Sequence, residues 1–475
     1  MSLYGSGLMI NPTSPSSAMP ISHQSSALTT NYPLQADNDQ LDERAWQDPE
    51  LSLRDFVAGI SQLAVMGVIE TTGIAEAIHR EIVLRPLRLL NHRYGDLWYK
   101  GISGRVYQVV KGITSIVGHS LAMGLKQYCQ LMHHTKPHPL PNTLSMVVNV
   151  INGVMGDHLV SNNNPLALPM TLYGVDSHHK YTKPILSKRT GADESLSKLG
   201  NTTQTVYTNQ RIKGRVVIIL HGLCMGYINW QPDDDASLGR RVIKNLPAST
   251  VFYLNYNTGQ RISTNGRQFS QLLEMLITQY PDITQIDLIG HSMGGLVSRS
   301  ALYYGSEQQH DWVNKVQKLI TLGSPHHGAL LERIGDVVQQ SIGKLPFAGS
   351  LAKLGDIRSM GIIDLRHGSV RDEDWQSLQA RSVLPDSERH ATPLPQHIKA
   401  YFLAGSLSEE GQASKVSDLL GDGLVNINSA LGEHTTEHTL AVPKEHKAVF
   451  YGVGHMALLS DEQVLDKTVE WLVEG

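Results

Sequence analysis

Cysteine is almost absent from this sequence of 475 residues, which contains only Cys129 and Cys224. Two cysteines cannot form the dense disulfide framework that holds small secreted domains together. An excess of positive charge is also missing, because 40 Lys and Arg residues stand against 44 Asp and Glu residues, which gives a formal net charge of -4. Proteins that bind nucleic acids present basic surfaces, so no nucleic-acid partner is predicted.

Long apolar runs are missing as well. No stretch reaches the roughly 18 uninterrupted apolar residues that a membrane-spanning helix needs, and the first residues lack the charged region and apolar run of a secretory signal peptide. We therefore expect a cytoplasmic protein, with peripheral contact to the inner membrane as the open alternative. Metal-binding patterns such as H-E-x-x-H and paired C-x-x-C do not occur in the sequence, so neither a metal nor a cofactor is predicted.

The composition changes twice along the chain. Residues 1–48 are rich in Ser, Pro, Asn and Thr and have few large apolar side chains, which predicts a disordered polar tail. Residues 49–165 carry apolar residues at three- and four-residue steps, and this spacing predicts a helical N-terminal subdomain. The stripes with this spacing cover residues 56–69, 74–84, 102–121 and 144–159.

These helices have two interpretations. The favoured one is that their apolar stripes pack on one another and on the rest of the protein. The alternative is a membrane or partner surface, because nine Lys and Arg residues outnumber five Asp and Glu residues between Arg54 and Lys126. Basic amphipathic helices of this kind bind anionic lipid surfaces.

Residues 166–475 are predicted to form an α/β domain. Apolar runs alternate here with helical spacing, as in a mostly parallel, doubly wound sheet. The segment from about 330 to 395 is too long for an ordinary connection, and it is predicted to be a helical lid inserted between two strands. The predicted strands cover residues 215–220, 250–256, 286–289, 318–322, 398–404 and 448–451.

One motif in this domain has a chemical meaning. Gly290-His-Ser-Met-Gly294 follows a predicted strand and precedes a predicted helix, which is the setting of a G-x-S-x-G nucleophile elbow. The glycines leave room for a crowded, strained turn that exposes the Ser292 hydroxyl. The N–H group of Met293, at the start of the helix, would stabilise a developing oxyanion.

The second oxyanion donor is predicted in the motif His221-Gly-Leu223, directly after the strand 215–220. Enzymes with this elbow place a loop with the other donor at that position, and we assign the role to the N–H group of Leu223. Cys224, the next residue, has two interpretations, a reactive thiol or a small buried filler. The second is the commoner fate of such a cysteine and is favoured.

The acid and the base of the site are predicted from their order along the chain. Enzymes with this elbow carry the acid and then the histidine after the serine. Asp422 lies between two glycines after the fifth predicted strand, and His455 follows the last predicted strand. His455 would accept the proton of Ser292, while Asp422 would orient and stabilise its ring. Asp418 is a rival acid, disfavoured because turn glycines do not flank it.

The remaining histidines near these motifs receive other roles. His434, His438 and His446 also follow the acid, but none of them closes a strand, so they are predicted to be surface residues. His326 and His327 lie at the end of a strand. They are expected to shape a loop beside the site, and contact with substrate is the alternative.

Five motifs therefore occur in one order along the chain, namely His221-Gly-Leu223, Gly290-His-Ser-Met-Gly-Gly295, Leu322-Gly-Ser-Pro-His-His-Gly328, Gly421-Asp-Gly-Leu-Val425 and Gly454-His455. Together they resemble bacterial lipases and esterases of the α/β-hydrolase superfamily, and they look nearest to the branch that includes the GPI-inositol-deacylase-like lipases. The resemblance covers the chain from about residue 170 to its end. It implies an α/β-hydrolase fold, a role in lipid metabolism and cleavage of a carboxylic ester with an acyl chain.

Three functions remain open at this point. The leading hypothesis is a serine hydrolase, an esterase or lipase, that forms an acyl-enzyme on Ser292. An acyltransferase with the same triad would differ only in admitting an alcohol in place of water. A non-catalytic, membrane-associated binding protein is the third hypothesis, disfavoured because nucleophile, acid, base and oxyanion motifs all occur in the sequence.

Overall fold

The computed structural model describes residues 51–53, 55–63, 140–175, 181–182, 185–188, 204–207, 212–232, 234–329, 359–376, 390–409, 421–435 and 437–474. Several sequence predictions lie outside the described residues: the tail 1–48, the helical stripes 74–84 and 102–121, Cys129, Asp418 and most of the expected lid. No helix among the described residues is long and apolar enough to cross a membrane.

Eight strands form one mostly parallel sheet. They cover Thr171–Val175 (β1), Tyr181–Thr182 (β2), Gly214–Leu220 (β5), Thr250–Asn255 (β6), Ile283–His291 (β7), Val316–Leu322 (β8), Lys399–Ser406 (β9) and Lys447–Tyr451 (β10). Their order in the sheet is β10-β9-β8-β7-β5-β6-β1-β2. Strands β10 to β6 pair in parallel, whereas β1 pairs antiparallel with β6 and with β2. The predicted sheet is confirmed, and a separate antiparallel pair is formed by Ile185–Lys188 (β3) and Gln204–Tyr207 (β4).

The central strand β5 explains why the apolar runs in the sequence are continuous. Val216 and Ile218 belong to one core cluster, and Val217 and Ile219 belong to another. All four side chains are fully buried. Successive side chains of a strand point to opposite faces, so a strand that is covered on both faces needs an apolar residue at each position.

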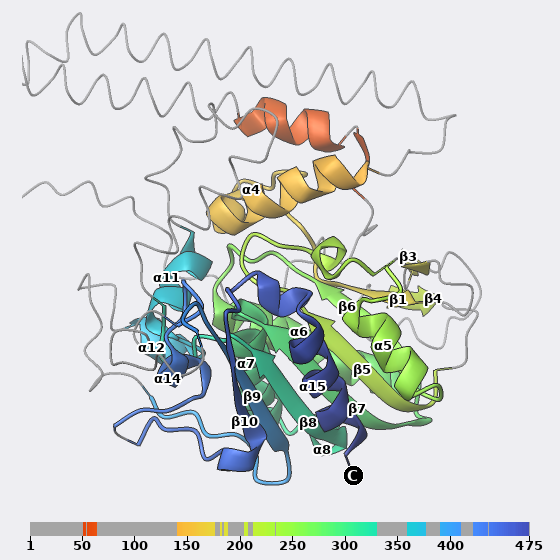
Figure 1. The fold of residues 1–475 in the computed structure, drawn as a ribbon. Helices are drawn as coiled ribbons and strands as arrows, with labels where there is room; N and C mark the ends of the chain where they lie inside the picture. Colours follow the sequence, from red (N-terminus) through yellow and green to blue (C-terminus); the bar gives the residue numbers. More distant parts are fainter. Residues whose placement is uncertain are drawn as a thin grey trace, which may run out of the picture. The chain divides into compact units, whose positions relative to one another are not determined.

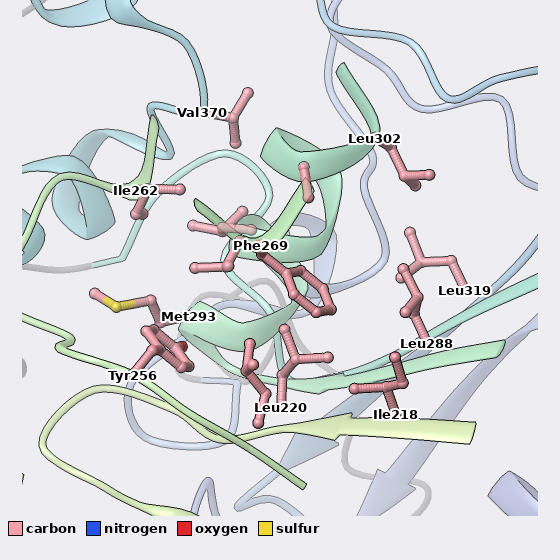
Figure 2. Packing of buried hydrophobic residues seen from close by; sticks show 14 of the residues in the cluster. Ile218, Leu220, Tyr256, Ile262, Phe269, Leu288, Met293, Leu302, Leu319 and Val370 are labelled. Carbon is pink, nitrogen blue, oxygen red and sulfur yellow. The ribbon is translucent and has the colours of Figure 1, made fainter. Parts of the chain in front are cut away.

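Helices cover both faces of the sheet (Figure 1). Their bounds are Leu238–Asn245 (α5), Ile262–Gln279 (α6), Met293–Glu307 (α7), Trp312–Lys315 (α8) and Glu462–Val473 (α15). Residues of α6, α7 and α8 join the cluster that contains Ile218, while residues of α5 and α15 join the cluster of Val217. Figure 2 shows the first cluster, with Phe269 of α6 and Leu302 of α7. Four short helices lie in the loops: Tyr227–Trp230 (η2), Ile427–Ala430 (α14), Lys444–His446 (η6) and Ala457–Leu459 (η7).

Helix α4, which covers Asn142–Ser161, is buried on two sides. Its residue Val150 belongs to the same core cluster as the sheet and α6, whereas Ile151 packs in a separate cluster with the helical residues 55–63. The helix is kinked at Met155, where φ is -143° and ψ is 25°. The predicted stripe 144–159 therefore packs on the rest of the protein, as the favoured interpretation expects.

The described part of the expected lid packs on the core. It contains Met360–His367 (α11) and Asp372–Gln376 (α12). Asp364 of α11 forms an ion pair of 2.5 Å with Arg261, and its other oxygen accepts the N–H of Ile262 at the start of α6. The Ser359 hydroxyl donates to the carbonyl oxygen of Gly153 in α4 at 2.7 Å. A lid that covers the site stays a prediction for the rest of the insertion.

Candidate active site

Ser292 lies in a sharp turn between β7 and α7. Strand β7 ends at His291 and helix α7 begins at Met293, and Ser292 between them has a φ of 53° and a ψ of -120°. A positive φ strains a residue that carries a Cβ atom, at a cost of about 1–3 kcal/mol, so the surroundings must hold the turn in place. One such contact is the N–H of Ser292, which donates to the carbonyl oxygen of Leu322 in β8 at 2.9 Å.

The two glycines of the motif have no room for a side chain. A Cβ atom on Gly290 would lie 2.4 Å from the nitrogen of Gly295, and one on Gly294 would lie 2.8 Å from the carbonyl oxygen of Leu220. Both contacts are with backbone atoms, which cannot move aside without opening the turn. The crowding that the sequence predicted at these two positions is confirmed.

Met293 presents different groups to the core and to the site. Its side chain is buried in the cluster that Figure 2 shows. Its N–H group is the first of α7, and the first N–H groups of a helix have no acceptor within the helix. The helix dipole adds partial positive charge at this end. The group therefore has the properties of an oxyanion donor.

Leu223 lies in the loop after β5, beside Ser292. The preceding residue, Gly222, is so close to the elbow that a Cβ atom on it would lie 3.0 Å from Ser292 Cβ and 3.0 Å from His291 Nδ1. Leu223 itself lines the same small pocket as Ser292 and His455. The structure thus brings both predicted oxyanion donors to one site.

The direction of the Leu223 N–H group is set by His221. Tyr256 donates its N–H to His221 Nε2 at 3.3 Å, so the proton of the neutral ring is on Nδ1, which lies 2.9 Å from the carbonyl oxygen of Gly222. Burial lowers the pKa of His221 to about 4, which keeps the ring neutral. In a trans peptide the C=O and the next N–H point in opposite directions. Holding the Gly222 carbonyl therefore fixes the Leu223 N–H.

Asp422 and His455 form a hydrogen-bonded pair. Asp422 Oδ2 lies 2.7 Å from His455 Nδ1, and both side chains are buried. Asp422 Oδ1 accepts the N–H groups of Leu424 at 3.0 Å and Val425 at 2.8 Å. Burial acts to raise the pKa of Asp422, but the ring of His455 and these N–H groups together lower it below its ordinary value. The ionised carboxylate accepts the Nδ1 proton, which leaves Nε2 of His455 able to accept another.

Ser292 and His455 line one small pocket. Its other lining residues are Leu223, Met225, His291, Leu424 and Met456. Ser292 is only 2% exposed, whereas Met456 at the rim is 47% exposed. Apart from the serine and the two histidines, the lining side chains are apolar. The pocket combines the predicted nucleophile and the predicted base with apolar walls.

His291 is a neighbour of this site for which no role was predicted. Its Nε2–H donates to the carbonyl oxygen of His455 at 3.1 Å, and the centroids of the two rings are 4.8 Å apart. Burial, together with the nearby ring of His455, lowers the pKa of His291 to about 3, so the ring is neutral. The signal was present in the sequence, because His291 and His221 are themselves members of the two motifs that supply Ser292 and Leu223.

His326 and His327 do not line the pocket. His326 is fully buried, with Nε2 3.1 Å from the Thr321 hydroxyl and its ring stacked on Phe402 at 4.3 Å between centroids. His327 is partly buried, and its N–H donates to the Ser429 hydroxyl at 3.0 Å. Both residues therefore hold the loop after β8, in agreement with the favoured expectation.

The prediction that three later histidines are surface residues is wrong for His438, which is only 6% exposed. Its loop folds back on the core, where the N–H of Leu440 donates to the carbonyl oxygen of Gly432 at 2.9 Å. His434 and His446 are partly buried, and His446 Nδ1 lies 3.1 Å from the carbonyl oxygen of Ala400. The polar sequence around these residues gives no sign of this folding.

The comparison with protein families gives one match. Residues 211–402 match the model of the PGAP1-like alpha/beta domain. This segment, which is less than half of the chain, is similar to the PGAP1-like family. The matched segment contains β5 to β8 and the elbow of Ser292, and the resemblance predicted from the motifs is confirmed. The mostly parallel sheet with helices on both faces is an α/β-hydrolase fold.

Many solved structures are similar to this chain, among them three from bacteria, whereas no curated protein sequence matches it. The mature Bacillus licheniformis lipase BlEst2 is 20% identical, with 54% of this chain and 90% of that chain covered and a TM-score of 0.34. The lin2722 product of Listeria innocua is 16% identical, with 56% and 95% covered and a TM-score of 0.31. A thermophilic esterase from Thermogutta terrifontis is 14% identical, with 55% and 90% covered and a TM-score of 0.29.

Proposed function

We propose that the protein is a serine hydrolase that cleaves carboxylic esters of lipid-like substrates through an acyl-enzyme on Ser292. One observation carries the proposal. Ser292 stands in a strained turn and lines a pocket together with His455. Nδ1 of His455 is hydrogen-bonded to the buried carboxylate of Asp422. This is the set of nucleophile, base and orienting acid that ester cleavage by serine requires.

The first half of the reaction forms the acyl-enzyme. Ser292 Oγ attacks the ester carbonyl carbon while His455 Nε2 takes the hydroxyl proton. The carbonyl oxygen becomes an oxyanion that faces the N–H groups of Leu223 and Met293. When the tetrahedral intermediate collapses, the bond to the alcohol oxygen breaks, and His455 returns its proton to the leaving alcohol.

The second half releases the acid. His455 takes a proton from water, and the hydroxide attacks the acyl carbon. The same two N–H groups bind the resulting oxyanion. When this tetrahedral intermediate collapses, the bond to Ser292 Oγ breaks, and Oγ recovers its proton from His455. Asp422 stays ionised throughout, since its low pKa opposes protonation, and it stabilises the imidazolium in each half.

The pocket walls support the proposed substrate class. Leu223, Met225, Leu424 and Met456 surround the nucleophile with apolar surface, and burial of apolar groups there favours an acyl chain over a polar acyl group. Methionine side chains are flexible and adapt to chains of different shape. An acyl ester or lipid is therefore the proposed substrate.

The test compares wild type with Ser292→Ala on nitrophenyl esters from acetyl to palmitoyl. We expect the variant to lose turnover by about 10⁴- to 10⁶-fold, the range seen when a serine nucleophile is removed. A fluorophosphonate probe should label the wild type at Ser292 and leave the variant unlabelled. Unchanged turnover in the variant would contradict the proposal.

Products distinguish hydrolysis from acyl transfer at the same triad. With a short alcohol added to the assay, we expect free acid as the main product at every ester tested. An ester of the added alcohol that replaces the acid would instead identify an acyltransferase.

A further inference from the structure

Cys224 has an unusual backbone conformation next to the predicted oxyanion donor. Its φ is 59°, in the left-handed region that residues other than glycine rarely adopt. The side chain is buried and belongs to the main core cluster, as the sequence predicted. A strained residue keeps such a conformation only where its neighbours determine it, and two neighbours of Cys224 do so.

The first neighbour is Thr258, in the loop after β6. Its hydroxyl accepts the N–H of Cys224 at 3.1 Å, and both groups are buried. This bond holds the peptide between Leu223 and Cys224. The preceding peptide is held through the Gly222 carbonyl, which accepts from His221 Nδ1 and from the N–H of Met225. The two peptides that flank Leu223 are therefore both fixed.

The second neighbour is Gly153, in the middle of α4. It lies so close to Cys224 that a Cβ atom on it would be 2.3 Å from Sγ, 2.8 Å from Cα and 2.9 Å from the backbone nitrogen. Two of these three contacts are with the backbone of Cys224. The thiol could turn away from an added methyl group, but the backbone atoms could not avoid it without moving the loop.

The same helix packs on the end of the loop. A Cβ atom on Gly226 would lie 2.3 Å from Nδ2 of Asn149, which is itself buried. Helix α4 thus covers the loop over Cys224 and Gly226, and Thr258 holds it from the loop after β6. A small residue at position 153 is what permits this close approach.

We propose that Gly153 and Thr258 are positioning residues for the reaction, because they hold Cys224 in the conformation that aims the Leu223 N–H at the oxyanion. The inference rests on the proposed serine hydrolase function. It makes α4, which precedes the α/β-hydrolase sheet, part of the machinery that stabilises the transition state. The two residues act through Leu223 and touch no substrate.

The experiment measures kcat, KM and the dissociation constant of an alkyl trifluoromethyl ketone, which forms a tetrahedral oxyanion adduct with an active serine. Gly153→Ala should lower kcat by about tenfold to a hundredfold, which is less than complete removal of an oxyanion donor costs. KM should stay within about threefold, because substrate binding uses the oxyanion hole less than the transition state does. Affinity for the ketone should fall in proportion to kcat/KM.

Thr258 gives an independent variant pair if Gly153→Ala does not fold. Thr258→Val keeps the shape of the side chain but leaves the Cys224 N–H without its acceptor, so it should lower kcat and ketone affinity in the same way. Thr258→Ser keeps the hydroxyl and should retain wild-type values. Ile151→Ala, on the other buried side of α4, is the matched control, and it should lower the thermal midpoint while kcat is retained.

Two results overturn the inference. The first is wild-type kcat and ketone affinity in folded Gly153→Ala and in Thr258→Val. The second is an equal loss of kcat in Ile151→Ala, which would mean that only the stability of the helix matters. If the wild type neither hydrolyses esters nor reacts with a fluorophosphonate at Ser292, the proposed function is wrong and the inference is wrong too. If the wild type is active but the variants behave as in either of the two results above, only the inference is wrong.

Discussion

His291 donates its Nε2–H to the backbone carbonyl oxygen of His455 at 3.1 Å. The residue before the predicted nucleophile is therefore hydrogen-bonded directly to the backbone of the predicted base. This contact complements the side-chain bond between Asp422 and the ring of His455. His455 is therefore held both through its backbone and through its side chain, which fixes the position of its ring relative to the turn of Ser292.

The pH dependence of stability should report the buried ring of His291. Its pKa is about 3 in the folded protein and about 6.5 in the unfolded chain. As the pH falls below 6.5, the unfolded chain takes up a proton that the folded protein cannot bind. The free energy of unfolding should therefore fall by up to about 1.4 kcal/mol per pH unit for this group, until the pH approaches the folded pKa.

The measurement is urea unfolding of wild type and His291→Gln between pH 4.5 and 7.5. Gln can still donate to the His455 carbonyl but takes up no proton. The unfolding free energy of the variant should therefore change less steeply with pH than that of the wild type. His221, with a folded pKa of about 4, remains in both proteins and keeps part of the slope. Equal slopes in the two proteins would contradict the prediction.

Asp422→Asn should remove the charge that stabilises the imidazolium while it preserves the local fold. The Asn carbonyl oxygen can still accept the N–H groups that Asp422 Oδ1 accepts now. We expect kcat to fall by about 10⁴-fold, as in other serine triads with this change. Circular dichroism should show a folded variant.

Asp418→Asn is the control for this change, because Asp418 was the rival acid in the sequence. Full activity is expected in that variant. Loss of activity in Asp418→Asn together with retained activity in Asp422→Asn would show that Asp418, and not Asp422, is the acid of the site.

Gly290→Ala should abolish activity by crowding the elbow, since the added Cβ atom would lie 2.4 Å from the Gly295 nitrogen. Gly214→Ala is a matched comparison at the start of β5. Gly214 also has a positive φ, of 69°, but open space surrounds the position of its Cβ atom. This second variant should lose only about 1 kcal/mol of stability from backbone strain and keep its kcat. Turnover of nitrophenyl acetate and thermal midpoints check both expectations.

Reversible binding to anionic membranes is predicted from the basic charge between Arg54 and Lys126. Leu53, directly before this region, and Val57, at its described start, are 50% and 42% exposed. The protein should sediment with vesicles of anionic phospholipid at low salt and dissociate as salt screens the charges. Vesicles of neutral phospholipid are the control, and absence from the anionic pellet at low salt would contradict the prediction.

Local patterns in the sequence predicted most of the sheet and the proposed triad. The strands were visible because both faces are covered, so that Val216 to Leu220 are all apolar. Strand β1 was missed, since it is short and contains Gly174, which weakens a strand signal. Ser292, Asp422 and His455 were found because each lies in a short glycine-containing motif that follows a strand.

The contacts that hold the site were not predictable in this way. Gly153 and Thr258 meet Cys224 only in the folded chain, and none of the three residue types has a chemical signature at its position. The burial of His438 has the same origin, because it depends on a loop folding back over the sheet. Contacts between distant segments depend on packing, which single-sequence patterns do not encode.

The hydroxyl of Ser359 gives Gly153 a second partner, 206 residues further along the chain. The insertion after β8 is thus fastened to the same glycine that packs on Cys224. Anyone who builds chimeras by exchanging this insertion between related proteins should keep a hydroxyl at position 359. A graft without one would remove a contact of the helix that packs beside the loop of Cys224, so the insertion and α4 should be transplanted together.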